Sequence, residues 1–255
     1  MSKFLSGLLL TGLLASVSQA DFVRVEMGAG MWNQSVTGDI QYTGETAFTT
    51  DTLNYGSEGK SYLWAYIKHP VPIIPNLRLE YAAVEFEGTT TQNFTYNGKN
   101  FSGSSVSTLT MDQFDAILYY NILDNTAWTT IDLGLDVKSM KGEFKAVSTP
   151  SGVNITESQS LVLPMLYGRG RVEIPGTDIG FEAEVKYLGY QESKVMDASI
   201  KVDYTLVDMI PFVDLGIEAG YRTQTINIDA TDISSVDTSL TLDVDGVFFG
   251  IVGRF

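Results

Sequence analysis

The feature that most constrains this chain is a two-residue alternation of apolar and polar side chains that recurs in ten segments. In one of them, Ile131, Leu133 and Leu135 alternate with Asp132 and Asp136. Successive side chains of a β-strand point to opposite faces, so the pattern predicts strands with one apolar and one polar face. The ten segments are 23–32, 61–69, 77–83, 113–120, 131–138, 162–173, 181–188, 198–205, 213–222 and 239–255.

Alternation alone does not separate a membrane barrel from a soluble sandwich, but two further features favour the barrel. Charged residues recur in the middle of the polar faces, and the segments approach the roughly 10 residues that a tilted membrane span needs. Strands of soluble proteins are most often about 5–6 residues long. We therefore predict an all-β fold over residues 21–255, a closed antiparallel transmembrane β-barrel of ten strands. Eight is the nearest competing count.

The connections between these segments alternate in length. Those after the odd segments are mostly long and rich in Thr, Ser, Asn and Gly: 33–60, 88–107, 139–159, 191–195 and 225–237. Those after the even segments are short: 70–76, 122–127, 175–179 and 208–211. Short periplasmic turns and long outer loops are typical of barrels in the outer membrane of Gram-negative bacteria. An even strand count then places both termini in the periplasm.

The first twenty residues have the pattern of a secretory signal peptide. Lys3 precedes the apolar stretch 4–15, and Ser18 and Ala20 are the small residues expected before a cleavage site. The apolar stretch is too short to span a membrane as a helix. We predict cleavage after Ala20.

Composition excludes several classes of function. The chain has 31 acidic and 16 basic residues and a net charge of −15, which argues against nucleic acid as a partner. It has no Cys, so thiol catalysis, disulfides and thiolate metal sites are excluded. We expect no cofactor and no metal.

The last ten residues carry a resemblance to a known class. Phe255 is C-terminal, and Ile251, Phe249 and Val247 occupy alternate positions upstream. This strand resembles the terminal strand of small bacterial outer-membrane β-barrel proteins, most of them uncharacterised, in which the barrel assembly machinery reads such a pattern. The resemblance implies that Phe255, Ile251, Phe249 and Val247 form the assembly signal.

Charged residues on the polar faces are expected to line the lumen. Projected onto depth, they gather in the periplasmic half: Arg24, Glu26, Arg78, Glu80, Asp132, Arg171, Glu173, Glu182, Glu184, Lys201, Asp203, Asp214, Glu218 and Arg254. A ten-strand bore is little wider than side chains can fill. Charges within a membrane protein must pair or meet water. We interpret the set as a salt-bridged plug with trapped water; the alternative is a narrow, porin-like channel for ions or small solutes.

An enzymatic role is weakly supported, and we predict none. The chain's only His, His69, precedes Pro70 at a predicted periplasmic turn. The outer-membrane enzymes that resemble this size, omptin proteases and lipid A deacylases, place catalytic residues at the outer rim. A lipid-modifying enzyme is therefore a distant alternative.

Carboxylates around the last outer loop raise the question of a Ca²⁺ site. They are Asp229, Asp232, Asp237, Asp243 and Asp245. Oxygen ligands of this kind suit Ca²⁺, but the spacing fits no EF-hand loop. We interpret them as a solvated acidic loop.

The function that these patterns favour is a structural or surface-interaction role in the cell envelope. The expected partners are outer-membrane lipids, lipopolysaccharide and the barrel assembly machinery, together with a surface ligand that the sequence does not identify.

Overall fold

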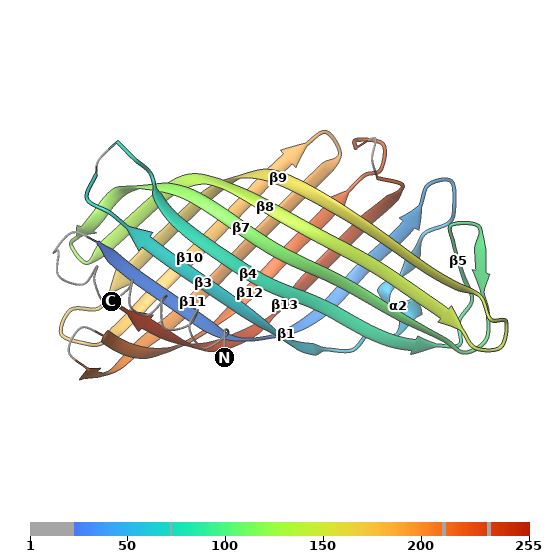
Figure 1. Cartoon of the computed structure of the whole chain (residues 1–255), viewed down its shortest axis with the longest axis horizontal. Helices are drawn as coiled ribbons and strands as arrows, with labels where there is room; N and C mark the ends of the chain where they lie inside the picture. The colour runs from blue at the N-terminus through green and yellow to red at the C-terminus, as the bar shows by residue number, and fades with distance from the viewer. Residues whose placement is uncertain (1–22, 72, 211–212, 234–235) are drawn as a thin grey trace, which may run out of the picture.

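The computed structural model describes residues 23–71, 73–210, 213–233 and 236–255, so the predicted signal peptide 1–20 lies outside the described residues. Ten antiparallel strands form a sheet whose first and last members pair, which closes a barrel (Figure 1). They are β1 (Arg24–Tyr42), β3 (Glu58–Lys68), β4 (Asn76–Thr90), β7 (Ser105–Thr126), β8 (Thr129–Ser148), β9 (Asn154–Glu173), β10 (Ile179–Tyr190), β11 (Ser193–Ile210), β12 (Val213–Ile228) and β13 (Thr238–Arg254). The predicted closed ten-strand barrel is confirmed, and the competing count of eight is excluded.

The barrel closes where its first and last strands meet. β1 pairs with β13 from Glu26↔Arg254 to Tyr42↔Thr238. At the end of this ladder the Phe255 amide donates to the Val25 carbonyl at 2.8 Å. The beginning of β1 and the end of β13 therefore lie at the same end of the barrel. We call the half of the barrel at this end the terminal half and the other half the distal half.

The alternation gives the wall an apolar outside and a polar inside. In β8, Leu133 and Leu135 point outward and are 52% and 61% exposed, whereas Asp132 and Asp136 on either side of them are fully buried. A soluble protein has the opposite polarity, and transmembrane barrels have this one. No helix in the described part of the chain is long and apolar enough to cross a membrane.

The predicted loop 139–159 is wrong, because β8 and β9 continue through most of it. Their pairing extends to Val147↔Asn154, so only a short turn joins them. Beyond Val137 the next four outward-facing residues of β8, from Ser139 to Lys145, are polar. The apolar signal therefore ends although the hydrogen-bonded ladder continues.

The predicted outer loops 33–60 and 88–107 also contain ordered structure. After β1, the short strand β2 (Phe48–Thr49) leads into one helical turn, α2 (Thr50–Leu53), whose first turn is capped by the Thr49 hydroxyl. The second connection forms a hairpin of β5 (Phe94–Tyr96) and β6 (Lys99–Phe101). Figure 1 shows β5 and α2 toward the end of the barrel away from the C-terminus.

These two segments bury apolar side chains inside the distal half. Phe94 and Phe101 of the hairpin stack with ring centroids 4.7 Å apart, and Phe48 lies 5.0 Å from Phe94. The Tyr96 ring packs against Phe144 of β8, and its hydroxyl lies 2.8 Å from that of Thr238 on β13. The distal lumen is therefore filled by an apolar core.

The distal wall has two seams at which neighbouring strands stop pairing. β3 and β4 pair from Ile67↔Leu77 to Tyr62↔Ala82, although β4 continues to Thr90. β9 and β10 pair from Gly180↔Glu173 to Tyr187↔Leu166, although β9 begins at Asn154. The seams separate two sheets in the distal half, β4-β7-β8-β9 and β11-β12-β13-β1.

The seam beside β4 is filled by the segment around α2. Leu53 and Phe86 are fully buried there, and Tyr55 packs against the Phe86 ring at 6.1 Å. The Gln34 amide donates to the Ala83 carbonyl at 2.7 Å, and the Asn54 amide donates to that of Thr89 at 3.2 Å. These side-chain contacts, together with one backbone bridge between Tyr55 and Gly88, replace the missing ladder partners of β4.

Candidate functional site

The lumen of the terminal half and the middle of the barrel is filled by charged side chains, each at most 12% exposed. Nine of the ten barrel strands contribute at least one of them, and β3 contributes aromatic side chains instead. The cations are Arg78, Lys138, Arg169, Arg171, Lys186, Lys201, Arg222 and Arg254, and the carboxylates are Glu26, Glu80, Asp115, Asp132, Asp136, Glu182, Glu184, Asp197, Asp203 and Glu218. Eight cations against ten carboxylates leave a small negative excess. We call this set the ionic layer.

Arg78 joins opposite walls of the barrel. It extends from β4, and its guanidinium lies 2.5 Å from Glu80 on its own strand. Across the bore on β10 it lies 2.9 Å from Glu184 and 3.6 Å from Glu182. Lys186 of β10 reaches back across the bore to Glu80. β4 and β10 are not neighbours in the sheet, so these ion pairs cross the bore rather than follow the wall.

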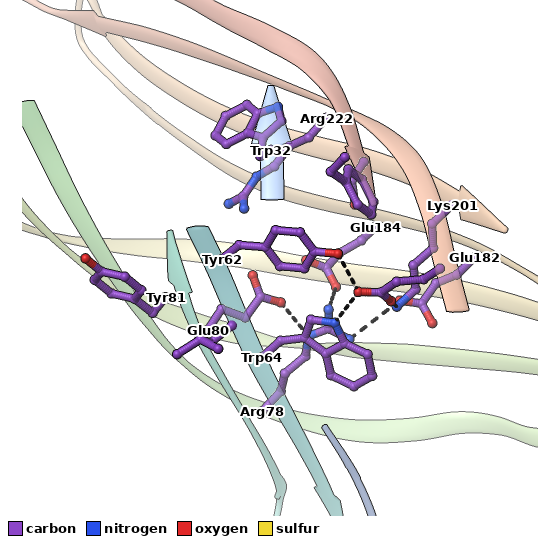
Figure 2. A pocket seen from close by; sticks show the side chains of 14 residues that line it. Trp32, Tyr62, Trp64, Arg78, Glu80, Tyr81, Glu182, Glu184, Lys201 and Arg222 are labelled. Atoms are coloured by element: carbon purple, nitrogen blue, oxygen red, sulfur yellow. Dashed lines mark hydrogen bonds and ion pairs between the residues drawn. The ribbon is translucent and has the colours of Figure 1, made fainter. Parts of the chain in front are cut away.

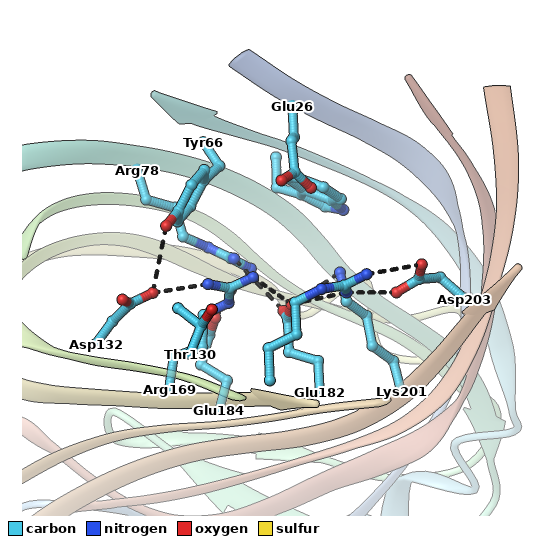
Figure 3. A network of polar contacts seen from close by, with 12 residues as sticks. Glu26, Tyr66, Arg78, Thr130, Asp132, Arg169, Glu182, Glu184, Lys201 and Asp203 are labelled. Carbon is cyan, nitrogen blue, oxygen red and sulfur yellow. Dashed lines mark hydrogen bonds and ion pairs between the residues drawn. The ribbon is translucent and has the colours of Figure 1, made fainter. Parts of the chain in front are cut away.

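Two arginines near the end of β9 extend the layer, and Figure 3 shows one of them, Arg169, between Asp132 and Glu182. Arg169 lies 2.7 Å from Asp132 on β8 and 2.6 Å from Glu182 on β10. Arg171 lies 2.5 Å from Asp203 on β11, which also pairs with Arg254 of β13. Arg169 therefore bridges the strands on either side of β9, and Arg171 reaches past β10 to β11. The planar guanidinium group suits such multiple contacts with carboxylates.

The distal edge of the ionic layer is a second cluster of charges and amides. Lys138 of β8 lies 2.8 Å from Asp115 and 3.1 Å from Asp197. Arg222 pairs with Asp197 at 2.6 Å. The amides of Gln113 and Gln224 lie 2.9 Å apart and bond this cluster from opposite sides. This edge adjoins the apolar core of the distal half.

Aromatic rings on β3 cover the charges from one side. The Tyr62 hydroxyl and the Trp64 indole N–H both donate to one oxygen of Glu218, at 2.8 and 2.9 Å (Figure 2). Lys201 lies 4.2 Å from the centre of the Trp64 ring, within the range of a cation–π contact. The cavity here has a volume of about 40 Å³. That leaves room for about three water molecules.

Asp136 differs from the other lumen carboxylates. Its side chain is fully buried, and neither carboxylate oxygen has a hydrogen-bond partner. It lies on β8 two residues from Lys138, whose ammonium pairs with Asp115 and Asp197 instead. Asp136 is therefore a carboxyl group that the ion pairs do not satisfy.

The structure brings most of the predicted lumen residues together. Eleven of the fourteen lie in the ionic layer, and the exceptions are Arg24, Glu173 and Asp214. Arg24 and Glu173 are 47% and 42% exposed, and they face each other at 3.8 Å across the rim. Asp214 is exposed at the start of β12. These three belong to the open end of the barrel because they lie within the first or last two residues of their strands.

Sequence reasoning missed seven members of the ionic layer: Asp115, Asp136, Lys138, Arg169, Lys186, Asp197 and Arg222. All seven lie on the polar face of a strand. The alternation therefore contained the signal. They were left out because the predicted charges were restricted to the periplasmic half, whereas the ionic layer continues through the middle of the bore.

The remaining candidate residues have local structural contacts. The His69 ring lies 3.1 Å from the Pro75 carbonyl and accepts from the Val71 amide, so it holds the turn between β3 and β4. The Asp232 carboxylate accepts from the amides of Glu192 and Ser193 and from the Ser193 hydroxyl. No described group of three or more His, Asp or Glu side chains is arranged to hold a metal ion. Val247, Phe249 and Ile251 face outward at 44–65% exposure.

The barrel is closed and antiparallel, with an apolar exterior and a charged interior. These features place the protein in the class of β-barrels that have the architecture of transmembrane barrels. No protein-family model and no curated protein matches the sequence.

The solved structures to which the chain is similar include three bacterial proteins. Ail, the attachment invasion locus protein of Yersinia pestis, is 9% identical with a TM-score of 0.35, over 92% of this chain and 99% of that one. The transport unit of the autotransporter AIDA-I from Escherichia coli is 9% identical at 0.42, over 92% and 90%. The translocator domain of NalP from Neisseria meningitidis is 16% identical at 0.33, over 99% and 95%. TM-scores this low support neither a strand count nor a function for this chain.

Proposed function

We propose that this chain is an integral β-barrel of a bacterial outer membrane, with a plugged lumen and a structural or surface-interaction role. The observation that carries the proposal is the set of buried ion pairs that cross the bore, of which Arg78 with Glu184 is the clearest. A layer that joins opposite walls holds the cylinder rigid and leaves little room for solute.

The outer face supports the membrane location. Large apolar side chains are exposed around the wall, including Leu63, Leu118, Leu166, Phe181, Ile200, Ile217 and Ile251. Soluble monomers rarely expose a continuous apolar surface larger than a few hundred Å². A band of this kind matches the lipid-facing band of outer-membrane barrels.

We further propose that the terminal half faces the periplasm. The turn between β7 and β8 and that between β9 and β10 lie at the terminal end and are short. The distal end carries α2 and the β5–β6 hairpin, with exposed polar tips at 43–47 and 149–152. Such tips are the surface that the outside would meet.

A channel is the alternative, and conductance separates the two. The purified mature chain should give no steady conductance steps in a planar bilayer, because the charged lumen holds a cavity of only about 40 Å³ and an apolar core fills the distal half. A known porin inserted under the same conditions is the positive control. Reproducible steps from the wild-type chain would replace the plug with a channel.

The surface role is tested by shortening only the exposed tips. Deleting 33–60 or 139–159 would remove strand residues, so the variants replace 43–47 and 149–152 with Gly-Ser linkers. We expect a folded barrel with reduced attachment or an altered envelope phenotype. Unchanged attachment and envelope in a double variant would contradict the surface role and leave a structural one.

We propose no enzymatic activity, and the contacts of His69 support this. Both ring nitrogens are engaged within its own turn. His69→Ala should alter no activity on lipid A. An activity present in the wild type and lost in His69→Ala would establish a lipid-modifying enzyme.

The assembly signal remains part of the proposal. Phe255→Ala should lower the amount of folded barrel in the membrane of cells, while the same chain refolds in detergent as wild type does. A loss in both settings would indicate a role in stability rather than recognition by the barrel assembly machinery.

A further inference from the structure

The seam between β9 and the β10–β11 hairpin contains an apolar cavity of about 230 Å³. Its floor consists of Leu163, Val195 and Ile228, which point into the barrel. Pro164, whose side chain points outward, borders its mouth. The cavity therefore connects the lipid-facing side of the wall with the apolar core, through a place where the strands do not pair.

The seam is not closed by backbone hydrogen bonds. The β9–β10 ladder ends at Leu166↔Tyr187, and Pro164 lies two residues beyond it with no N–H to donate. A free strand edge is usually covered or interrupted. Here Leu188 of β10 and Ile233 of the β12–β13 loop reach over the gap.

The loop that carries Ile233 is held in place from the neighbouring turn. Asp232 accepts from the Glu192 amide at 3.1 Å and from the Ser193 amide at 2.9 Å. The Ser193 hydroxyl also donates to Asp232 at 2.7 Å. Asp232 thus anchors the loop and positions Ile233 over the cavity.

The cavity lies at the distal edge of the apolar band. Pro164 pairs with Val137 of β8, and the next outward residues of β8 are Ser139 and Lys141. At this level a membrane changes from acyl chains to headgroups. Exposed Lys194 lines the mouth and supplies a positive charge at that boundary.

We propose that this cavity binds one acyl chain of the phosphorylated glycolipid of the outer leaflet, lipid A. The inference rests on the proposed outer-membrane location with the distal half outside. The cavity is continuous with the lipid-facing wall, and its apolar lining suits a hydrocarbon chain. Lys194 suits a phosphate at the headgroup. The volume is below the roughly 300–1,000 Å³ of pockets that enclose a drug-sized ligand, so it takes the end of a chain rather than a whole molecule.

Lipid retention by the full mature chain tests the proposal. The folded barrel in mild detergent is incubated with equal amounts of diphosphorylated lipid A and phosphatidylglycerol, and native mass spectrometry counts what stays bound. Wild type should retain lipid A in preference to phosphatidylglycerol. Leu188→Trp fills the cavity and should lower retention about tenfold. Lys194→Glu should lower it about fivefold or more.

Matched controls separate the cavity from the wall. Leu166→Trp changes a lipid-facing residue that does not line the cavity, and Lys141→Glu changes an exposed lysine of β8. Both should retain lipid A as wild type does. Equal retention by Leu188→Trp and Leu166→Trp, or equal retention of phosphatidylglycerol, would overturn the proposal.

Failure of this inference is distinguishable from failure of the proposed function. If Leu188→Trp does not fold, Lys194→Glu against Lys141→Glu decides the question. A barrel that inserts into bilayers without conductance and retains no lipid A would remove only the acyl-chain site. A barrel that conducts would remove the plugged lumen whatever it binds.

Discussion

At the scale of single residues, partners decide what a buried charge does to stability. Arg78 lies among Glu80, Glu182 and Glu184 and is only 5% exposed. Asp136 is equally buried, but neither of its carboxylate oxygens has a hydrogen-bond partner. Removing one member of a buried ion pair leaves an uncompensated charge, whereas removing an unsatisfied charge takes away a cost.

Arg78→Met should destabilise the barrel strongly. It leaves two or three carboxylates without their cation, and loss of one partner in a buried pair typically costs about 3–5 kcal/mol. Unfolding by urea in detergent, followed by Trp fluorescence, measures the change. Lys145→Met is the control, because the Lys145–Glu143 pair is exposed and such pairs contribute about 0–1 kcal/mol. Equal effects of the two variants would show that the ionic layer adds little to stability.

Asp136→Asn should leave stability unchanged or raise it. The amide has nearly the shape of the carboxyl group and carries no charge to bury. Asp115→Asn is the contrasting variant, because Asp115 pairs with both Lys138 and Lys186. The urea midpoint of Asp115→Asn should fall below that of Asp136→Asn. The reverse order would mean that Asp136 has a stabilising role that its contacts do not reveal.

At the scale of elements, two strands of this barrel extend well beyond their last pair with one of their neighbours. β9 continues for twelve residues beyond its last pair with β10, and β4 continues for eight beyond its last pair with β3. Side chains of α2 and of the last loop fill the two seams. Backbone amides at a seam are therefore protected by packing rather than by a second ladder.

Amide hydrogen exchange should report this difference along β9. Amides in 155–163 that point toward the seam should exchange faster than those in 166–172, which are paired on both sides. Exchange in detergent, read by NMR or by mass spectrometry of short peptides, measures the rates. Residues 106–114 of β7 serve as a control, because they lie in the distal half and pair with both β4 and β8. Equal protection in 155–163 and 166–172 would contradict the seam.

At the scale of the whole molecule, the start of β1 and the end of β13 are neighbours. Val25 and Phe255 exchange backbone hydrogen bonds, and the turn at 149–152 is exposed at the distal end. A permuted chain that joins residue 255 to residue 23 by a short linker and opens at 150–151 should fold. New termini are tolerated at exposed turns when the old ones lie close together.

The mobility of the permuted chain on unheated SDS gels measures that outcome, since a folded barrel migrates differently from the unfolded chain. The control opens the chain at 168–169, within the ladders of β9. That variant should not fold. Failure of the 150–151 permutant alone would indicate that the order of strand formation matters.

Sequence reasoning predicted the barrel but only part of its interior. The strand order and count followed from alternation, because a face in lipid has to be apolar at every second residue, as Leu133 and Leu135 are. Beyond Val137 the alternation of β8 inverts, because its outward residues are polar and its inward residues Met140, Phe144 and Ala146 belong to the apolar core. The β5–β6 hairpin and α2 were invisible for a related reason, since Phe94 and Leu53 fill a lumen that was expected to be occupied by charge alone.

Pairing partners could not be predicted either. That Arg78 meets Glu184 depends on the shear of the barrel and on which strands face each other across the bore. Neither quantity is encoded in a local pattern. Lys194 and Ile233 line one cavity only because the β9–β10 ladder ends at Tyr187 whereas the β10–β11 ladder continues to Tyr190.

Nine of the ten strands supply a charged group to the lumen, and ion pairs such as Arg78–Glu184 and Arg254–Asp203 join strands that are not neighbours in the sheet. An incomplete sheet that entered the hydrocarbon would carry bare charge into it, at a cost of several kcal/mol for each group. Hydration of those side chains must therefore persist until the last strand has docked on the first. Insertion of this chain should therefore be a single concerted event in which water leaves the interior last.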